Sequence, residues 1–234
     1  MERAPRSVNE MVEYQVQRWL AEQQKRRQER RILESPAPIV TISREAGALG
    51  TTLGRLVAER LGFRLWDQEL VQRIAEESGA SETLLAAVDE QARNAIEDLL
   101  AGILMGDSFT EKEYLAQLMR VVHAIAQHGG AVIIGRGAQF VLPPDAALRV
   151  RVVGSLEERV RSVASSRRLS ARDARSEVER VDRERLAFIR HHYHQDGADP
   201  HAYDLIVNST AIPLERAVDV VVSAYHAKFP QKSH

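Results

Sequence analysis

Short runs of apolar and β-branched residues alternate with helical segments from residue 38 almost to the C-terminus. Five runs read as strands: 38–43 (PIVTIS), 63–66 (FRLW), 131–135 (AVIIG), 147–153 (ALRVRVV) and 203–208 (YDLIVN). Strands that alternate with helices form a parallel sheet covered by those helices. The sequence therefore predicts an α/β, three-layer fold with a central parallel five-stranded sheet. Ligands of such sheets bind beyond the carboxyl ends of the strands.

Helical spacing and capping signals predict the segments between the strands. The predicted helices cover about 51–61, 68–78, 82–104 and 213–228. Thr110 and Glu113 form a capping box that predicts a helix from 110 to about 128, and Ser155 and Ser170 are expected to cap two more helices.

The N-terminal segment has a different character from the rest of the chain. Val8, Val12, Val16 and Trp19 share one face of a predicted helix, and the prolines of residues 35–38 (SPAP) end the segment. We predict an N-terminal helical extension with a linker over 1–37, ahead of a domain at 38–230. The apolar stripe is expected to pack on that domain or on a second copy, as a homodimer, so deleting residues 1–34 should change oligomeric state or solubility.

Composition excludes several classes of function. The 234 residues include no cysteine, which excludes disulfides and thiolate metal sites and is compatible with a cytoplasmic location. A formal net charge of −1 gives no case for nucleic-acid binding. No apolar run approaches the roughly 18 residues that a membrane span needs, so no membrane association is expected.

The turn after the first strand reads SREAGALGTT and has the features of an anion site. Gly47 and Gly50 allow a tight turn in which successive N–H groups face one anion, and the helix that follows adds its positive end. Thr51 and Thr52 offer hydroxyl groups to a phosphate-bound Mg²⁺. An ordinary strand-to-helix turn is the alternative interpretation.

Charged residues also follow the second and third strands. Asp67 comes directly after the second strand, with Arg73 six residues later, although an aspartate there is also an ordinary helix cap. Arg136 stands between Gly135 and Gly137 after the third strand. Because that place is the carboxyl edge of the sheet, we expect Arg136 to contact a ligand.

Residues 159–190 hold ten arginines and no lysine. Many have acidic neighbours, as in SEVERVDRER, and this pattern predicts a solvated helix face with side-chain ion pairs. An arginine-bearing helix is also what a phosphoryl-transfer lid requires, because positive charge must close over the transferred group.

Six ordered blocks between about 38 and 228 together resemble the cytidylate-kinase-like family of P-loop proteins: TISREAGALGTTLGRLVAERLG, LWDQELVQRIA, IIGRGAQFVL, LRVRVVGSLEERV, VDRERLAFIRHHY and YDLIVNSTAIPLERAVD. The resemblance implies a P-loop nucleotide-kinase-like fold with a helical insertion, the acceptor region, at about 67–128 and an arginine-rich lid at about 159–195. It also implies transfer of the γ-phosphoryl group of ATP, with Mg²⁺, to a nucleoside monophosphate.

The resemblance implies roles for individual residues. It places Asp67, Arg73, Gly135 and Arg136 in the acceptor site and matches the lid motif at Asp182, Arg183 and Arg185. It places Gly47, Gly50, Thr51 and Thr52 at the donor phosphates, with Thr51 on the metal. The phosphate loop departs from the family pattern, since Arg44 stands at its first glycine and Gly50 at its lysine.

The missing lysine raises a specific question about Arg44. No lysine lies between Lys25 and Lys112, so arginine is the expected cation. One hypothesis makes Arg44 the catalytic substitute in an ATP-dependent phosphotransferase, with a lysine at position 50 tolerated by the fold. The other pairs Arg44 with Glu45 or another acid and makes the protein a catalytically impaired, nucleotide-binding regulatory or interaction protein.

Overall fold

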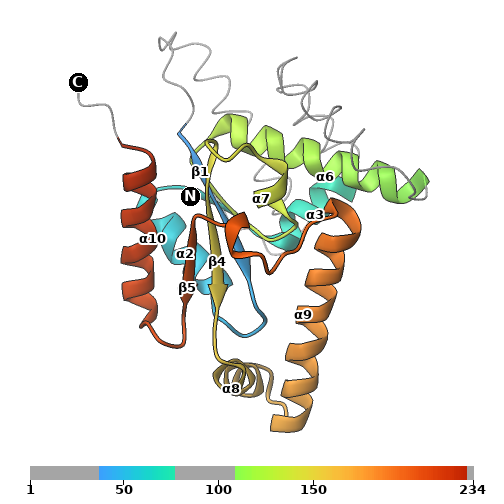
Figure 1. Cartoon of the computed structure of the whole chain (residues 1–234), viewed down its shortest axis with the longest axis vertical. Coiled ribbons are helices and arrows are strands. Elements are labelled where there is room, and N and C mark those ends of the chain that lie inside the picture. Colours follow the sequence, from blue (N-terminus) through green and yellow to red (C-terminus); the bar gives the residue numbers. More distant parts are fainter. Residues whose placement is uncertain (1–36, 77–108, 231–234) are drawn as a thin grey trace, which may run out of the picture. The chain divides into compact units, whose positions relative to one another are not determined.

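The computed structural model describes residues 37–76 and 109–230 of the chain (Figure 1). It consists of two compact units: Met1–Ala37 with Gln68–Gly129, which we call the helical unit, and Pro38–Asp67 with Gly130–His234, which we call the sheet unit. The division falls near both ends of the predicted acceptor region, whose role stays a prediction. The predicted N-terminal helix, the homodimer through it and the predicted helix at 82–104 lie outside the described residues.

The sheet unit contains all five strands of the described chain. The strands are β1 (Ile39–Arg44), β2 (Arg64–Trp66), β3 (Ala131–Ile134), β4 (Ala147–Val153) and β5 (Leu205–Asn208). Its helices are α2 (Gly50–Leu61), α7 (Ala138–Val141), α8 (Leu156–Arg167), α9 (Ala171–Tyr193), the 3-10 helix η1 (Pro200–Ala202) and α10 (Leu214–Lys228). The described helices of the helical unit, α3 (Gln68–Glu76) and α6 (Phe109–His128), pack against each other.

The strands form one parallel sheet in the order β2-β3-β1-β4-β5. This confirms the predicted five-stranded parallel sheet. β1 lies at its centre, where Ile42 pairs with Ile134 of β3 on one side and with Val150 of β4 on the other. Because all the strands run the same way, the residues that follow β1, β3 and β4 lie along one edge of the sheet.

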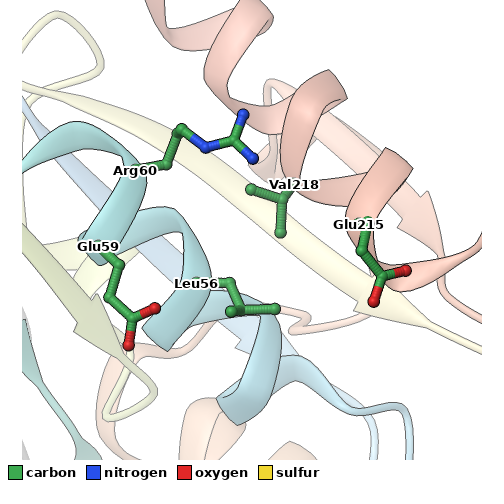
Figure 2. Close-up of a pocket in the computed structure, with 5 residues that line it drawn as sticks. All are labelled: Leu56, Glu59, Arg60, Glu215 and Val218. Carbon is green, nitrogen blue, oxygen red and sulfur yellow. The ribbon is translucent and has the colours of Figure 1, made fainter.

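Helices α2 and α10 pack on each other and on the sheet (Figure 1). A shallow groove runs between them, lined by Leu56, Glu59 and Arg60 of α2 and by Glu215 and Val218 of α10 (Figure 2). An exposed ion pair of 3.0 Å between Arg60 and Asp219 also joins the two helices. The groove lies along the sides of these helices, and none of the predicted site residues lines it.

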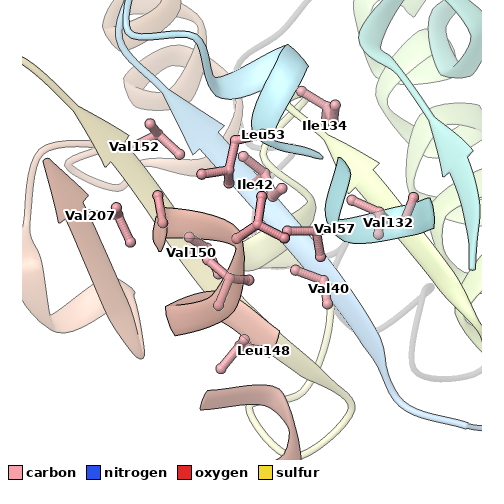
Figure 3. Packing of buried hydrophobic residues seen from close by; sticks show 14 of the residues in the cluster. Val40, Ile42, Leu53, Val57, Val132, Ile134, Leu148, Val150, Val152 and Val207 are labelled. Atoms are coloured by element: carbon pink, nitrogen blue, oxygen red, sulfur yellow. The ribbon is translucent and has the colours of Figure 1, made fainter. Parts of the chain in front are cut away.

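The hydrophobic core lies between these helices and the sheet (Figure 3). Val40, Ile42 and Val150 of the central strands are fully buried there, together with Leu53 and Val57 from one face of α2. Burial of each such side chain stabilises the fold by about 1.5–3 kcal/mol. β1 and the N-terminal half of α2 are therefore rigid supports for the turn between them.

Several local predictions needed correction or found support. The hydrogen bond from the Asp173 N–H to the Ser170 hydroxyl confirms the cap of α9. The capping box at Thr110 was wrong, because α6 already begins at Phe109. The short helix α7 was not predicted, since four residues are too few to show a period. No helix in the described part of the chain has the length and apolarity that crossing a membrane requires.

Candidate functional site

Three predicted site residues lie at the carboxyl ends of neighbouring strands. Arg44 is the last residue of β1, Arg136 comes two residues after β3, and Asp67 comes directly after β2. Since the strands lie in the order β2-β3-β1, the three residues follow adjacent strands of one sheet edge. Sequence spacing predicted each of them separately, and the sheet brings them together.

The Arg44 side chain lies in a crowded, positively charged place. Burial, followed by the charges of Arg185 and Arg136, lowers the pKa of its guanidinium to about 9, while Asp67 acts in the opposite direction. Burial also lowers the pKa of Arg185. Two further guanidinium groups and one carboxylate thus act on the guanidinium of Arg44, and such an excess of positive charge around a buried group favours a bound anion.

Glu45, the acid next to Arg44 in sequence, is held by other groups. Its Oε2 accepts the Gly154 N–H at 3.1 Å and lies 3.3 Å from Nε of Arg159, and its Oε1 lies 3.8 Å from Arg151. Among the described contacts of Glu45, none is with Arg44. Glu45 is therefore not the partner of Arg44. The carboxylate that acts electrostatically on Arg44 is Asp67, another acid of the kind that the second hypothesis allowed.

Gly50, which stands at the lysine position, has little room for a side chain. A Cβ atom there would lie 2.5 Å from Cβ of Arg44 and 3.0 Å from its Cγ. The first two carbon atoms of the Arg44 side chain thus pass directly over the first residue of α2. The prediction that Gly50→Lys leaves the fold intact was wrong, because even with Ala at position 44 the Cβ collision would remain.

The loop between β1 and α2 turns through Gly47, at φ +78°, and Leu49, at φ 55°. Leu49 is the N-cap of α2, and its own side chain makes no capping hydrogen bond. The N–H groups of the first turn of an α-helix have no partner within that helix, so they point out of its N-terminus. Thr51 and Thr52 belong to this turn, and Thr51 is exposed.

Three successive residues after β3 have positive φ angles: Gly135 at +81°, Arg136 at +54° and Gly137 at +69°. This backbone explains the two glycines. The hydroxyl of Tyr193 donates a hydrogen bond of 2.6 Å to the Arg136 carbonyl, and the Arg136 guanidinium lies 5.3 Å from the ring centre of Phe188. Two aromatic residues of α9 therefore hold Arg136: Tyr193 binds its backbone carbonyl, and the ring of Phe188 contacts its guanidinium.

The arginine-rich helices divide into a solvated face and a face toward the loop. Exposed ion pairs confirm the predicted solvated face, as between Arg180 and both Glu177 and Glu184. Arg185 turns inward and donates from Nη1 to the Arg44 carbonyl at 3.1 Å. Arg183 is exposed, and the structure does not bring it to Arg44 as it brings Arg185.

The remaining predicted site residue is Arg73. It belongs to α3 in the helical unit, and its side chain lies outside the described part of the chain. Its acceptor role stays a prediction.

Sequence reasoning missed Arg159, which is 7% exposed and contacts the loop. No local signal distinguishes it from the nine other arginines of residues 159–190, because burial depends on how α8 packs.

Together, the parallel sheet, the glycine turn before α2 and the arginines at the carboxyl edge define an α/β P-loop kinase fold. The sequence profile of the cytidylate kinase-like family matches residues 39–211, and the chain belongs to this family.

The chain is also similar to several individual proteins. Cytidylate kinase from Ignicoccus hospitalis is 27% identical over 186 residues, which cover 78% of this chain and 96% of that enzyme. A solved structure of an uncharacterized protein from Eubacterium ventriosum shares the fold, with a TM-score of 0.65 and 17% identity over 83% of this chain and 99% of that one. A partial match, 30% identical, is to uronate isomerase from Corynebacterium glutamicum; it covers 43% of this chain and only 20% of that enzyme.

Proposed function

We propose that this protein is an ATP-dependent phosphotransferase that acts on a nucleoside monophosphate or a similar small phosphorylated acceptor. Membership of the cytidylate kinase-like family supports kinase activity on a nucleotide or another small substrate. The observation that carries the proposal is the gathering of Arg44, Arg136 and Arg185. A phosphoryl group in transfer carries negative charge on its equatorial oxygens, which such groups offset.

Each residue has a distinct part in the proposed reaction. Arg136 and Arg73 hold the acceptor phosphate, and the N–H groups of Gly47 to Thr52 hold the donor phosphates. Arg44 takes the part of the loop lysine, because its planar fork grips two phosphate oxygens together. Arg185 offsets charge that develops during transfer.

The loop fits a Mg²⁺–nucleotide better than a free metal ion. No group of three or more metal-ligating side chains occurs among the residues that the structure describes. Thr51 is exposed in the first turn of α2 and offers one hydroxyl, so donor phosphates and water would supply the other ligands, as is usual for Mg²⁺. When bound, the ion would offset negative charge on the donor phosphates.

The test is a phosphotransfer and thermal-shift screen of nucleoside monophosphates with ATP and Mg²⁺. Arg44→Met should abolish turnover, since the apolar stem stays over Gly50 while the charge is lost. Arg55→Met is the matched control. Arg55 is exposed on α2, the helix that follows the loop, and among its described contacts it pairs only with Glu59.

The outcome separates catalysis from binding alone. Turnover that is lost in Arg44→Met and unchanged in Arg55→Met supports the proposal. If no monophosphate is phosphorylated although ATP stabilises the protein, the protein is a nucleotide-binding regulatory protein. If ATP with Mg²⁺ neither binds nor reacts, the donor site itself is refuted.

A further inference from the structure

A buried arginine of α8 contacts the loop that follows β1. The Arg159 side chain is 9% exposed. Its Nε donates to the Gly154 carbonyl at 3.0 Å, and its Nη1 donates to the Ala46 carbonyl at 3.1 Å and to Oδ2 of Asp182 at 2.6 Å. With Oε2 of Glu45 also 3.3 Å from Nε, this cation is compensated by two carboxylates and two carbonyls.

Asp182 of α9 holds the same loop by a second contact. Its Oδ1 accepts the Ala46 N–H at 2.7 Å, while its Oδ2 accepts from Arg159. Both polar groups of residue 46 are therefore bound, the N–H by Asp182 and the carbonyl by Arg159. Three residues along α9, Arg185 donates to the Arg44 carbonyl.

Apolar contacts attach the loop to these helices as well. The Ala46 side chain belongs to a small buried cluster whose other members come from α8 and α9: Val160, Val163, Ala174 and Val178. Gly47 lies so close to α8 that a Cβ atom there would be 2.5 Å from the Arg159 carbonyl oxygen. The loop and the two helices thus share one small core.

The pattern of these contacts points to the loop backbone. Buried charge is expensive unless it is fully compensated, and a compensated network of this kind holds one geometry rigidly. Here the network fixes the orientation of the peptide groups on both sides of residue 46. These peptides lie between Arg44 and Gly47, so their orientation determines where the Arg44 side chain and the following N–H groups point.

We propose that Arg159 and Asp182 are a positioning pair that holds the phosphate loop in its anion-binding geometry. This inference rests on the proposed function, and it places the pair on the donor side of that reaction. Arg136 is held separately by Tyr193, so the acceptor side does not depend on the pair.

The test compares two arginines of α8. Arg159→Met removes the buried cation, and Arg161→Met is the matched control, because Arg161 is exposed and pairs with Glu158 on the surface. Loss of a charge-assisted contact should raise the KM for ATP about tenfold in Arg159→Met, with the KM for the acceptor unchanged. Amide hydrogen exchange of residues 44–52 should accelerate in the same variant, and Arg161→Met should change neither quantity.

Two conservative variants keep the test decisive if Arg159→Met does not fold. Arg159→Lys keeps the charge without the fork, and Asp182→Asn keeps an oxygen for the Ala46 N–H without the charge. Each should give an intermediate KM for ATP and intermediate exchange.

Equal changes in both KM values, or unchanged exchange in the loop of every variant, would overturn the inference. If the wild-type protein transfers no phosphoryl group, the proposed function fails, and the exchange of residues 44–52 still decides whether the pair holds the loop.

Discussion

Substituting Gly137 by alanine should destabilise the protein strongly, through one side chain of α9. Gly137 has φ +69°, and a Cβ atom there would collide with the ring of Tyr193, lying 2.7 Å from Cζ and 2.9 Å from Cδ2. Tyr193 is only 3% exposed, packs beside Phe140 with ring centres 5.9 Å apart, and donates its hydroxyl to Arg136. The ring can therefore move only by breaking buried contacts.

The size of the effect follows from three contributions. A left-handed alanine costs about 1 kcal/mol, overpacking of a filled core costs about 1–3 kcal/mol, and a lost buried hydrogen bond costs about 1 kcal/mol. We expect the free energy of unfolding of Gly137→Ala to fall by about 3–5 kcal/mol in total.

Gly62→Ala is the control that separates strain from collision. Gly62 has nearly the same φ, +68°, but a Cβ atom there would meet nothing within 4 Å. Its substitution should cost only the backbone part, about 1 kcal/mol. Urea unfolding followed by tryptophan fluorescence measures both variants, because Trp66 is buried in the sheet unit. Equal losses in the two variants would refute the packing of Tyr193 on Gly137.

Three further predictions concern charged groups. Arg136→Ala should weaken binding of the acceptor nucleotide at least about tenfold by calorimetry, because a charge-assisted phosphate contact is lost; unchanged affinity would remove Arg136 from the site. Burial and the neighbouring arginines lower the pKa of Arg44 to about 9, so affinity for inorganic phosphate should fall above that pH. Without ligand, the free energy of unfolding should instead rise as the pH increases above about 9, because the unfolded state then binds more protons. An affinity for phosphate that stays flat across pH 9 would contradict this. Burial alone would raise the pKa of Asp204, but hydrogen bonds from Arg149 and Lys228 lower it from 3.8 to about 2. Asp204→Asn should therefore lower the free energy of unfolding at neutral pH by about 1 kcal/mol, a value reduced to allow for the partial exposure of Asp204 to solvent. In urea unfolding, the difference between the variant and the wild type should disappear as the pH falls from about 4 to 2.

The sequence by itself determined the local elements and the family. Short β-branched runs are typical of strands buried on both faces, so β1 and β3 could be located without any knowledge of their neighbours. Glycine adopts positive φ angles more easily than other residues, and the pair of glycines around Arg136 therefore marked a special turn at a strand end. Arg44 and Arg136 could be selected because the carboxyl edge of a parallel sheet is known before the order of its strands.

Only the tertiary structure decided which charges meet. In the order β2-β3-β1-β4-β5, the strands that precede Arg44 and Arg136 are neighbours, and α9 brings Arg185 to Arg44 across 141 residues of sequence. The same packing pairs Glu45 with Arg151 and Arg159, and none of the described contacts of Glu45 is with Arg44. Local sequence encodes φ preferences and hydrophobic periodicity. Which of two possible ion pairs forms depends instead on which charged side chains lie within about 4 Å of each other, and only the packed fold determines these distances.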